Sequence, residues 1–465
     1  MSSAVFEQLK AIAGPQGWTT DPDVLEPHLT EWRNVVRGQT PVMLSPNTTQ
    51  QVADIVEVCA ANGIALVPQG GNTGMCAAAV PDESGTQVIL SLSRLNSIRA
   101  IDANDYSMVA EAGCILANVQ DAAASVNRLF ALSLGAEGSC QIGGNLSTNA
   151  GGINVIRYGT ARAQVLGLEV VLPDGRIWNG LRSLRKNTAG YDLKQLFIGS
   201  EGTLGIITAA SLRLFPLPGE STVALLGLRR AEDATSLLAV LREQMADRIQ
   251  AFELIADRPM RWVEKHISGC RKPFDDSYPW YVLIETTIGG QTDLLQDSLE
   301  QALGAGLIAD AVIAKSDSEA ESLWRLRHSI SEAEKHEGAC LKHDIAVPIG
   351  KIAAFLQQGD ELLAKLCPDA RLVAFGHVGD GNLHYNVAQP EGADPKLFLA
   401  QSDAISAAIY DLAMAMGGSI SAEHGIGVLK RPWFHKYCDP VELELMQTLK
   451  KTLDPCNILN PGKVI

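Results

Sequence analysis

Three side chains of the kinds that bind divalent cations stand in two short glycine-rich segments toward the C-terminal end. The sequence GHVGDGNLHYN contains His377 and His384, and the later sequence SAEHGIG places Glu423 directly before His424. Two imidazoles and a carboxylate form the donor set of three-ligand metal sites that keep positions open for substrate or water. A single histidine is more often a hydrogen-bonded structural residue. Spacing alone therefore leaves a metal site and a pair of ordinary turns equally open.

Further polar side chains lie near these two segments. Asn386 follows His384 by two residues in a strand-like run, and side chains two apart in a strand point to the same face. Residues 323–331 (LWRLRHSIS) have helical spacing, and a strand-like run over 341–348 begins with Leu341-Lys342. Cations in such places usually belong to a solvated surface, and this is our interpretation of Arg325.

Three glycine-rich loops indicate a second kind of chemistry. They are PQGGNTG at residues 68–74, LGAEGSCQIGGNLSTNAGG at 134–152 and GSEGTLGIIT at 199–208. Glycine lets backbone N–H groups approach a pyrophosphate closely, and the hydroxyl and amide side chains add donors. Any one loop is more simply a turn, but three together favour a large phosphate-containing cofactor. No Walker sequence is present and no GxGxxG opens a helix after the first strand, which disfavours P-loop and Rossmann sites.

These loops, together with Tyr191-Asp192-Leu193, resemble the FAD-binding domain of the vanillyl-alcohol oxidase superfamily, and more closely its branch of D-lactate, glycolate and D-2-hydroxyglutarate dehydrogenases. The resemblance extends from near residue 38 to the C-terminus. It implies an α+β protein, with an FAD-binding domain of two α/β subdomains and a substrate domain. Some relatives link the flavin through a histidine in the first loop. That loop has neither His nor Cys here, so the predicted FAD is non-covalent.

The resemblance assigns the pyrophosphate to the first loop, the rest of FAD to the other two, and a further contact to the C-terminal tail. The residues so assigned are Pro68, Gly70, Gly71, Asn72, Thr73, Gly74, Gly138, Ser139, Gly143, Gly144, Asn145, Ser147, Thr148, Gly151, Gly202, Ile206 and Asn460.

The resemblance also assigns roles to the polar residues described first. It makes His377, His384 and Glu423 the ligands of a divalent ion, commonly zinc, and His424 the general base. It implies that the substrate contacts Arg327, Ser331, Lys342, Asn386 and His424, where Ser331 occupies a hydroxyl position that is usually Thr. His343 and Asp344 are expected to shape the same wall.

The implied reaction is oxidation of a 2-hydroxy acid. A metal ion that binds the hydroxyl and carboxylate oxygens lowers the pKa of the hydroxyl group. A neutral imidazole then accepts the proton near pH 7, and the flavin accepts the hydride. An arginine fork matches a carboxylate in bidentate fashion, as expected of Arg327.

Three classes of function remain open from the sequence. The favoured one is an FAD- and metal-dependent dehydrogenase of D-2-hydroxyglutarate, with D-lactate second and D-malate or glycolate as further substrates. The second is a flavin oxidase of the same fold, which would not need the three metal ligands. The third is a non-enzymatic flavoprotein subunit of a glycolate-oxidising complex. Because no second cofactor motif is present, electrons must leave for a separate acceptor. The resemblance suggests an electron-transferring flavoprotein or a quinone, and it allows a homodimer.

The elements that must position these residues follow from periodicity. Thr48 is a good N-cap for a helix through Ala61, which Gly63 ends before a buried strand at 64–67. Further strands are expected at 87–92, 107–110 and 167–172, and the turn PDGR joins the last of these to residues 177–178 as a hairpin.

A domain boundary is expected at residues 215–219 (FPLPG). Beyond it, strands at 223–228 and 280–287 alternate with helices at 231–245 and 291–303, which predicts an antiparallel sheet backed by helices. The resulting division is an FAD-binding domain over 1–218, a substrate-binding domain over 219–420 and a segment over 421–465 that returns to the FAD domain.

Composition excludes several other classes of protein. The chain has 465 residues, with 53 acidic against 38 basic side chains and a net charge of −15, which opposes a nucleic-acid surface. Its nine cysteines form no CxxC pair, so we expect reduced thiols and a cytoplasmic protein. No apolar stretch approaches the ~20 residues that span a bilayer.

Overall fold

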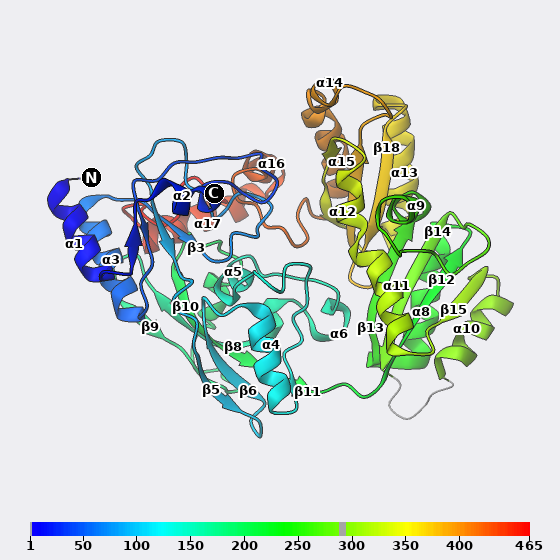
Figure 1. Ribbon diagram of the computed structural model, residues 1–465, viewed down its shortest axis with the longest axis horizontal. Helices are drawn as coiled ribbons and strands as arrows, with labels where there is room; N and C mark the ends of the chain where they lie inside the picture. The colour runs from blue at the N-terminus through cyan, green and yellow to red at the C-terminus, as the bar shows by residue number, and fades with distance from the viewer. Residues whose placement is uncertain (1, 288–293) are drawn as a thin grey trace. The chain divides into compact units, whose positions relative to one another are not determined.

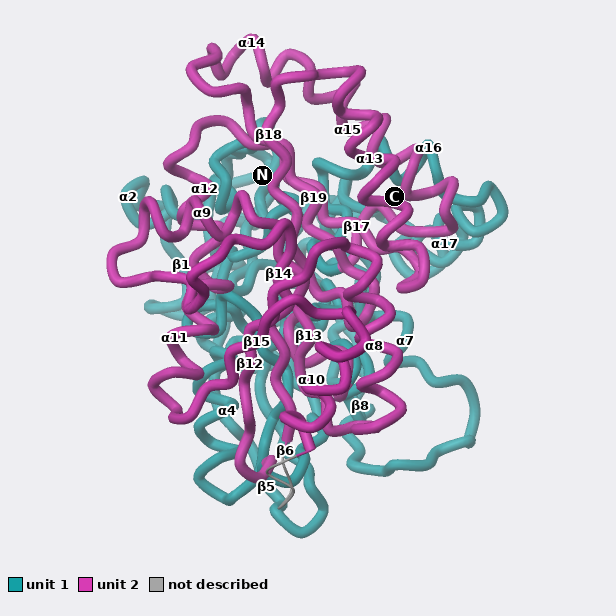
Figure 2. Tube along the Cα trace, turned by 90° about the vertical axis from the view of Figure 1, so that its right-hand side faces the viewer, with its two compact units in different colours: residues 1–151, 159–217, 423–465 teal, residues 152–158, 218–422 magenta. Residues whose placement is uncertain are grey.

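The computed structural model describes residues 2–287 and 294–465, shown in Figure 1. The chain divides into two compact units, coloured separately in Figure 2. Unit 1 consists of residues 1–151, 159–217 and 423–465, and unit 2 of residues 152–158 and 218–422. Residues 152–158, which the sequence analysis assigned to the FAD-binding domain, thus group with unit 2.

Unit 1 begins with a small sheet of four strands, in which the first strand of the order is antiparallel and the other three are parallel to one another. The strand order is β1 (Trp18–Thr19), β2 (Met43–Leu44), β4 (Val88–Ser91) and β3 (Leu66–Gln69). Helix α3 (Thr49–Asn62) leads into β3. The Thr48 hydroxyl accepts the N–H of Gln51 at its start, and Gly63 ends it with a φ of 61°. The expected N-cap and C-cap are both confirmed, so the chain enters β3 in a fixed direction.

The second sheet of unit 1 has five strands. Their order is β5 (Ile98–Asp102), β6 (Ser107–Glu111), β10 (Ile206–Arg213), β8 (Val165–Val171) and β9 (Ile177–Asn179). Strands β8 and β9 pair in antiparallel fashion, with Val171 opposite Ile177, which confirms the hairpin expected from PDGR. Helix α5 (Ile142–Ser147) is formed by the middle of the second glycine-rich loop and packs against β6 and β10.

The remaining elements of unit 1 are short, apart from three helices. They are α1 (Ser3–Ala13), α2 (Pro22–Leu25), η1 (Glu26–His28), α4 (Leu116–Ser125), β7 (Arg128–Leu129), η2 (Ala161–Gln164), α7 (Lys194–Phe197), β11 (Phe215–Pro216), α16 (Arg431–Tyr437) and α17 (Pro440–Leu453).

The C-terminal tail belongs to the small sheet of unit 1. Leu66 donates its N–H to the Ile458 carbonyl, and Asn460 donates its N–H to the Leu66 carbonyl. The tail therefore extends the sheet beside β3, directly upstream of the first glycine-rich loop.

Unit 2 is built on one antiparallel sheet of eight strands. The order is β15 (Asp310–Ile313), β12 (Ser221–Leu228), β14 (Trp280–Thr287), β13 (Ile249–Ala256), β18 (Arg371–Gly376), β19 (Asn382–Ala388) and β16 (Cys340–Leu341), with β17 (Asp344–Ala346) also paired to β19. This confirms the antiparallel sheet expected from the order of strands and helices.

Helices cover both faces of this sheet. Helices α9 (Asp257–His266), α11 (Asp317–His328) and α12 (Ile330–Lys335) share one apolar core with the sheet, in which Leu326 and Phe375 are buried. Helix α8 (Ala231–Met245) contacts β12 and β13, and it packs against α10 (Leu294–Gly304) and α13 (Ile352–Leu366).

The other elements of unit 2 complete its ends. They are α6 (Val155–Tyr158), η3 (Ala246–Arg248), η4 (Ile349–Lys351), α14 (Pro395–Leu399) and α15 (Ser402–Ala415).

Two expected elements differ in the structure. The helical stretch at 323–331 is interrupted at Ser329, where α11 ends and α12 begins, so Arg327 and Ser331 belong to different helices. The strand-like run at 341–348 forms two short strands, β16 and β17, separated by Lys342 and His343. The start of the helix expected at 291–303 falls outside the described residues. Among the described residues, no helix combines the length and hydropathy that a membrane crossing requires.

Candidate active site

Strand β19 positions a row of polar side chains on one face of the unit 2 sheet. His384 lies opposite Asp344 of β17 on one side and opposite Phe375 of β18 on the other. Asn386 lies opposite Val373. Directly opposed residues in antiparallel strands present their side chains on the same face, so register brings Asp344 and His384 together.

The three residues expected to bind a metal form a compact donor group. One donor atom from each of His377, His384 and Glu423 lies within 4.8 Å of the other two. The Nδ1 atom of His377 is 2.6 Å from a carboxylate oxygen of the buried Glu253. An ionised carboxylate only accepts hydrogen bonds, so Nδ1 is the donor in this contact. A carboxylate in this position orients a metal-binding imidazole.

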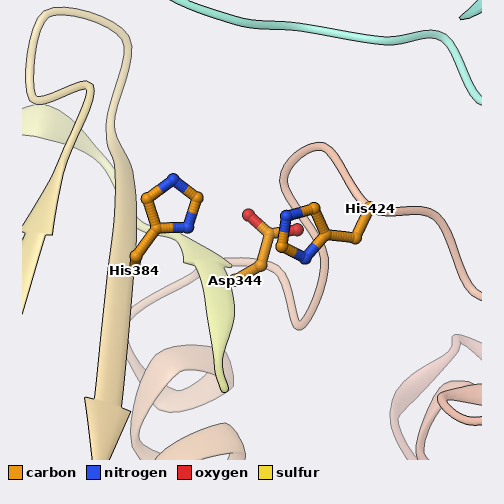
Figure 3. Close-up of side chains that lie close together, drawn as sticks. All are labelled: Asp344, His384 and His424. Atoms are coloured by element: carbon orange, nitrogen blue, oxygen red, sulfur yellow. The ribbon is translucent and has the colours of Figure 1, made fainter. Parts of the chain in front are cut away.

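A second donor group shares His384 and adds Asp344 and His424, again within 4.8 Å (Figure 3). Figure 3 shows the Asp344 carboxylate with the two imidazole rings close to it. The side chain of Asp344 is held by Asn382, whose amide donates at 2.9 Å, and by the backbone N–H of Ala422 at 3.2 Å. Because Glu423 and His424 follow Ala422 directly in the chain, this bond also anchors the segment that contains them.

Arg327 is fixed by a buried ion pair. Its Nε donates at 2.8 Å to Glu253, which is fully buried, and its guanidinium lies 4.8 Å from the centre of the Phe375 ring. Burial by itself would raise the pKa of Glu253. The electrostatic interactions and hydrogen bonds with His377 and Arg327 outweigh it and lower that pKa to about 2. The terminal guanidinium nitrogens make no hydrogen bond to any described residue, so they are available for a carboxylate ligand.

Glu334 organises the other two expected substrate contacts. Its carboxylate pairs with the ammonium group of Lys342 and accepts the amide of Asn386 at 3.0 Å. Glu334 is 1% exposed, so these bonds form in a desolvated environment where they are strong. Lys342 and Arg327 therefore each have a buried glutamate as partner.

Two expected site residues lie apart from this group. Ser331 is exposed on α12. His343 is buried, with its ring nitrogens 3.0 Å from the Tyr385 carbonyl oxygen and 3.0 Å from the Ser406 hydroxyl. These contacts are those of a structural histidine, whereas its neighbour Asp344 reaches the donor groups.

In unit 1, part of the glycine-rich sequence leaves open space. A Cβ atom added at Gly74, Gly138 or Gly144 would meet no protein atom within 4 Å. Open space beside loops that follow β3 and open α5 is what a bound cofactor requires.

Other glycines in the same loops are required by packing within the protein. A Cβ at Gly71 would lie 2.1 Å from the Ser139 carbonyl oxygen, and one at Gly143 would lie 2.8 Å from Ala112 Cβ. Gly202 has a φ of 72°. These glycines therefore bring the loops together irrespective of any ligand.

Gly151 has a separate role beside the donor groups. An added Cβ there would lie 2.6 Å from a carboxylate oxygen of Glu423. The absence of a side chain at Gly151 thus leaves the space that the Glu423 carboxylate occupies.

Buried oxygen atoms without partners support the assignment of FAD to unit 1. Within the described residues, the side-chain carbonyl oxygens of Gln141, Asn145 and Asn460 are buried and accept no hydrogen bond. Such groups are costly unless a ligand or water satisfies them. The Asn460 amide nitrogen is fully used, because it donates to the carbonyls of Ala78 and Glu201.

The remaining expected FAD contacts lie on or next to these loops, at the end of β3, around α5 and at the start of β10. They are Pro68, Gly70, Asn72, Thr73, Ser139, Ser147, Thr148 and Ile206.

Three buried glutamates beside the predicted site residues were not predicted from the sequence. Glu253 stands alone in the apolar run IQAFELIA, and a lone acid in a buried strand is a signal that could have found it. Glu334 is in an ordinary polar helix and has no such signal. Glu201 accepts the N–H groups of Ile426 at 2.7 Å and Gly427 at 2.8 Å, and desolvation by burial raises its pKa. It holds the chain just beyond His424.

Comparison with known proteins identifies the family. Residues 40–180 match the family described as FAD binding domain, and residues 217–464 match FAD linked oxidases, C-terminal domain. The chain belongs to the family of FAD-linked oxidases and is an FAD-dependent dehydrogenase. The resemblance inferred from the sequence and the FAD expectation are therefore confirmed.

Curated relatives narrow the branch of the family. The chain is 39% identical over 470 residues to "D-2-hydroxyglutarate dehydrogenase, mitochondrial" of Arabidopsis thaliana, an alignment that covers 100% of this chain and 82% of that protein. It is 41% identical to the Bos taurus protein of the same name, covering 96% of this chain and 80% of that one. A bacterial D-2-hydroxyglutarate dehydrogenase, from Xanthomonas citri pv. viticola, is 39% identical, covering 96% and 93%.

Solved structures confirm the fold class. p-Cresol methylhydroxylase with substrate bound is similar with a TM-score of 0.77 at 16% identity, over 100% of this chain and 97% of that one. Alkyldihydroxyacetonephosphate synthase gives a TM-score of 0.75 at 17% identity, over 99% and 85%. At these identities the likeness is one of fold alone.

The expected cytoplasmic location is contradicted by the names of the relatives. The proteins from Arabidopsis thaliana, Bos taurus and Danio rerio are named as mitochondrial. The nine cysteines are free, as expected. Free thiols are compatible with any reducing compartment, so they could not select the cytoplasm.

Proposed function

We propose that this dehydrogenase oxidises D-2-hydroxyglutarate to 2-oxoglutarate. The observation on which the proposal chiefly rests is the compact group of His377, His384 and Glu423, together with two cations held by buried glutamates. A dicarboxylic hydroxy acid needs both features. Its hydroxyl-bearing end binds at the donor group, where oxidation occurs, and its second carboxylate needs a cation to bind it. The names of the curated relatives support the same substrate.

We assign His377, His384 and Glu423 as ligands of a divalent ion, zinc or another metal. Their donor atoms lie within 4.8 Å of one another, and the bond from His377 Nδ1 to Glu253 orients the imidazole. When bound, the ion supplies Lewis acidity that lowers the pKa of the substrate hydroxyl.

We assign His424 as the general base that takes the hydroxyl proton. Asp344 is the carboxylate of the second donor group, and its oxygen lies within 4.8 Å of a ring nitrogen of His424. A carboxylate beside an imidazole fixes its tautomer and stabilises the imidazolium that forms on proton transfer. Neutral His424 accepts the proton on a ring nitrogen, and Asp344 stays ionised.

Arg327, Lys342, Asn386 and Ser331 are the proposed contacts for the substrate's oxygen atoms. The free guanidinium nitrogens of Arg327 offer a fork that matches a carboxylate. Lys342 and Asn386 are held at fixed positions by Glu334. Ser331 is the least supported member of the set because it is exposed on α12.

The three glycine-rich loops of unit 1 and Asn460 would hold FAD, which would supply the hydride-accepting chemistry for oxidation at the substrate's C2. Gly70 to Gly74 face the pyrophosphate in this assignment. The unpaired oxygens of Gln141, Asn145 and Asn460 serve the rest of the cofactor. Two electrons then leave for a separate acceptor, an electron-transferring flavoprotein or a quinone.

The test is anaerobic bleaching of the bound flavin with D-2-hydroxyglutarate, D-lactate, D-malate and glycolate in parallel. We expect the highest second-order rate constant with D-2-hydroxyglutarate. A higher value for D-lactate would replace the proposed substrate with the monocarboxylate. Bleaching by none of the four acids would contradict the assignment to 2-hydroxy acids.

A further inference from the structure

A basic cavity on unit 1 lies outside the proposed active site. Its volume is about 510 Å³, and its wall includes four cations, Arg162, Arg185, Lys194 and Arg213. The concentration of positive charge is notable on a protein with a net charge of −15.

Few acidic groups compensate these cations. Lys194 pairs with Asp192 at 2.5 Å, and Arg185 lies near enough to Asp105 to help lower the pKa of that carboxyl group, after hydrogen bonds from Ser183 and Ser107. Within the described residues, Arg162 and Arg213 have no carboxylate within 4.0 Å. The cavity therefore presents net positive charge to an incoming partner.

Exposed apolar side chains accompany the charge. The segment of residues 180–193 leads into α7 and projects from unit 1 in Figure 2. On it, Tyr191 is 96% exposed, Leu184 is 57% exposed and Leu193 is 41% exposed. Arginine and tyrosine are the side chains enriched at protein–protein interfaces. A small anion would need the cations and have no use for a protruding tyrosine.

The same surface lies directly behind the loops assigned to FAD. Arg162 donates its backbone N–H to the Asn149 side chain at 3.0 Å and its guanidinium to the Gln195 carbonyl at 3.1 Å. The guanidinium also donates to the Ile198 carbonyl at 2.5 Å, next to the third glycine-rich loop. A partner bound here would therefore be close to the cofactor-binding segments of the same unit.

We propose that this surface, which we call the basic patch (Arg162, Arg185, Lys194, Arg213, Leu184 and Tyr191), docks an electron-accepting protein through an acidic face of that partner. The inference rests on the proposed function, because a dehydrogenase without a second cofactor must pass its electrons to another molecule. The acceptor is a flavoprotein that takes the two electrons of the reduced FAD and becomes reduced itself. Charge complementarity selects a protein acceptor with an acidic face and speeds its encounter.

The experiment compares acceptors in the FAD-loaded enzyme with D-2-hydroxyglutarate as donor. The variant R185E/R213E changes the patch by four charges, and the control K365E/K396E makes the same change at exposed lysines of unit 2. We expect kcat/KM for purified electron-transferring flavoprotein to fall at least tenfold in R185E/R213E alone. Reduction of the small dye dichlorophenolindophenol should stay the same in all three proteins, because a dye needs no docking surface.

Arg185 also donates hydrogen bonds to the carbonyls of Asp105 and Tyr106, so its replacement removes contacts of the segment 180–193. A second variant controls for this effect. Y191S removes a side chain that is almost fully exposed, and we expect it to lower kcat/KM for the flavoprotein about tenfold with the dye rate unchanged. In the unmodified enzyme kcat/KM for the flavoprotein should fall with added salt, and in R185E/R213E this dependence should be lost.

Several outcomes would overturn the proposal. They are an unchanged kcat/KM for the flavoprotein in both variants, an equal loss in the control, a parallel loss of dye reduction, and no reduction of the flavoprotein by the unmodified enzyme. A change of oligomeric mass in Y191S with unchanged acceptor kinetics would instead make the patch a contact between copies of this chain. An error in the proposed function would be recognised separately, because D-2-hydroxyglutarate would then not bleach the flavin even in the absence of any acceptor.

Discussion

His424 differs from the two neighbouring histidines in its surroundings. His377 is committed to Glu253 through Nδ1, and His384 is shared by both donor groups. His424 lies with Asp344 and His384 at the end of the segment that Ala422 anchors. We propose that, next to the Asp344 carboxylate, His424 gains and loses a proton during the reaction.

Replacement of His424 by Gln should therefore reduce the rate of flavin reduction by at least ~100-fold, the usual scale for removal of a general base. The FAD spectrum and the metal content should be unchanged. The measurement is stopped-flow reduction under anaerobic conditions. His336→Gln, at an exposed histidine on the same unit as His384, is the matched control and should reduce FAD normally. A loss of less than tenfold at His424 would mean that another group is the base.

At the scale of elements, Glu253 joins three parts of unit 2. It stands on β13, accepts Arg327 from α11 and meets His377 just after β18. Its removal leaves the Arg327 cation buried without a partner, and breaking a buried pair in this way costs about 3–5 kcal/mol. We expect Glu253→Gln to lower the free energy of unfolding by about that amount, as measured by urea denaturation.

The double variant E253L/R327M tests whether the loss of stability comes from an unpaired buried charge or from altered packing. Replacing both members of a buried ion pair by apolar residues is often neutral or stabilising. The double variant should therefore recover most of the stability, although it should lose substrate binding. Equal destabilisation of the single and double variants would show that the sheet tolerates no change at this position for steric reasons.

A second glutamate joins α9 to β18. Glu337 bonds to Lys265 and His266 of α9 and to Arg371 of β18. Although burial alone would raise its pKa, the hydrogen bonds from His266, Lys265 and Arg371 lower it to about 2, from an ordinary value of 4.5. A lowered carboxyl pKa stabilises the folded state above pH 4.5, and this stabilisation is lost as the pH falls from about 4.5 to about 2.

We therefore expect Glu337→Gln to destabilise the protein by about 1–3 kcal/mol at pH 7, the range for hydrogen bonds to charged groups. The difference from the unmodified protein should shrink as the pH is lowered below 4.5. Urea denaturation at pH 7, 4.5 and 3.5 provides the measurement. A difference that is constant over this range would mean that the three cationic partners do not stabilise the ionised carboxylate.

In the molecule as a whole, different residues are assigned to FAD and to the proposed metal. The glycine-rich loops and Glu423 belong to unit 1, whereas His377 and His384 belong to unit 2. Treatment with EDTA should therefore abolish flavin reduction by D-2-hydroxyglutarate and leave the FAD bound. The flavin spectrum after gel filtration and anaerobic bleaching measure the two properties independently, and added zinc should restore bleaching. Full activity in metal-free protein would contradict the metal assignment and favour a metal-independent flavin oxidase.

Net charge also acts at this scale. A protein of net charge −15 repels an anionic substrate in its long-range field. Local cations must overcome that repulsion, and we propose Arg327 and Lys342, beside the proposed metal, for this purpose. The basic patch on unit 1 is a second, separate region where positive charge gathers.

Local sequence patterns were sufficient to predict features that lie within a few residues of one another. Thr48 and Gly63 set the ends of α3, the PDGR turn set the β8–β9 hairpin, and the glycine-rich loops indicated a phosphate-containing cofactor, which the family resemblance made FAD. Each of these depends on a few adjacent residues whose conformational preferences are fixed by their own chemistry.

Only the tertiary structure decided which distant residues meet. The register of β17 and β18 against β19 brings Asp344 to His384, and burial turns Glu253 and Glu334 into partners of Arg327 and Lys342. It also placed Arg327 on α11 and Ser331 on α12, because α11 ends at His328. These outcomes depend on desolvation and strand register over separations of many residues, which no local pattern encodes.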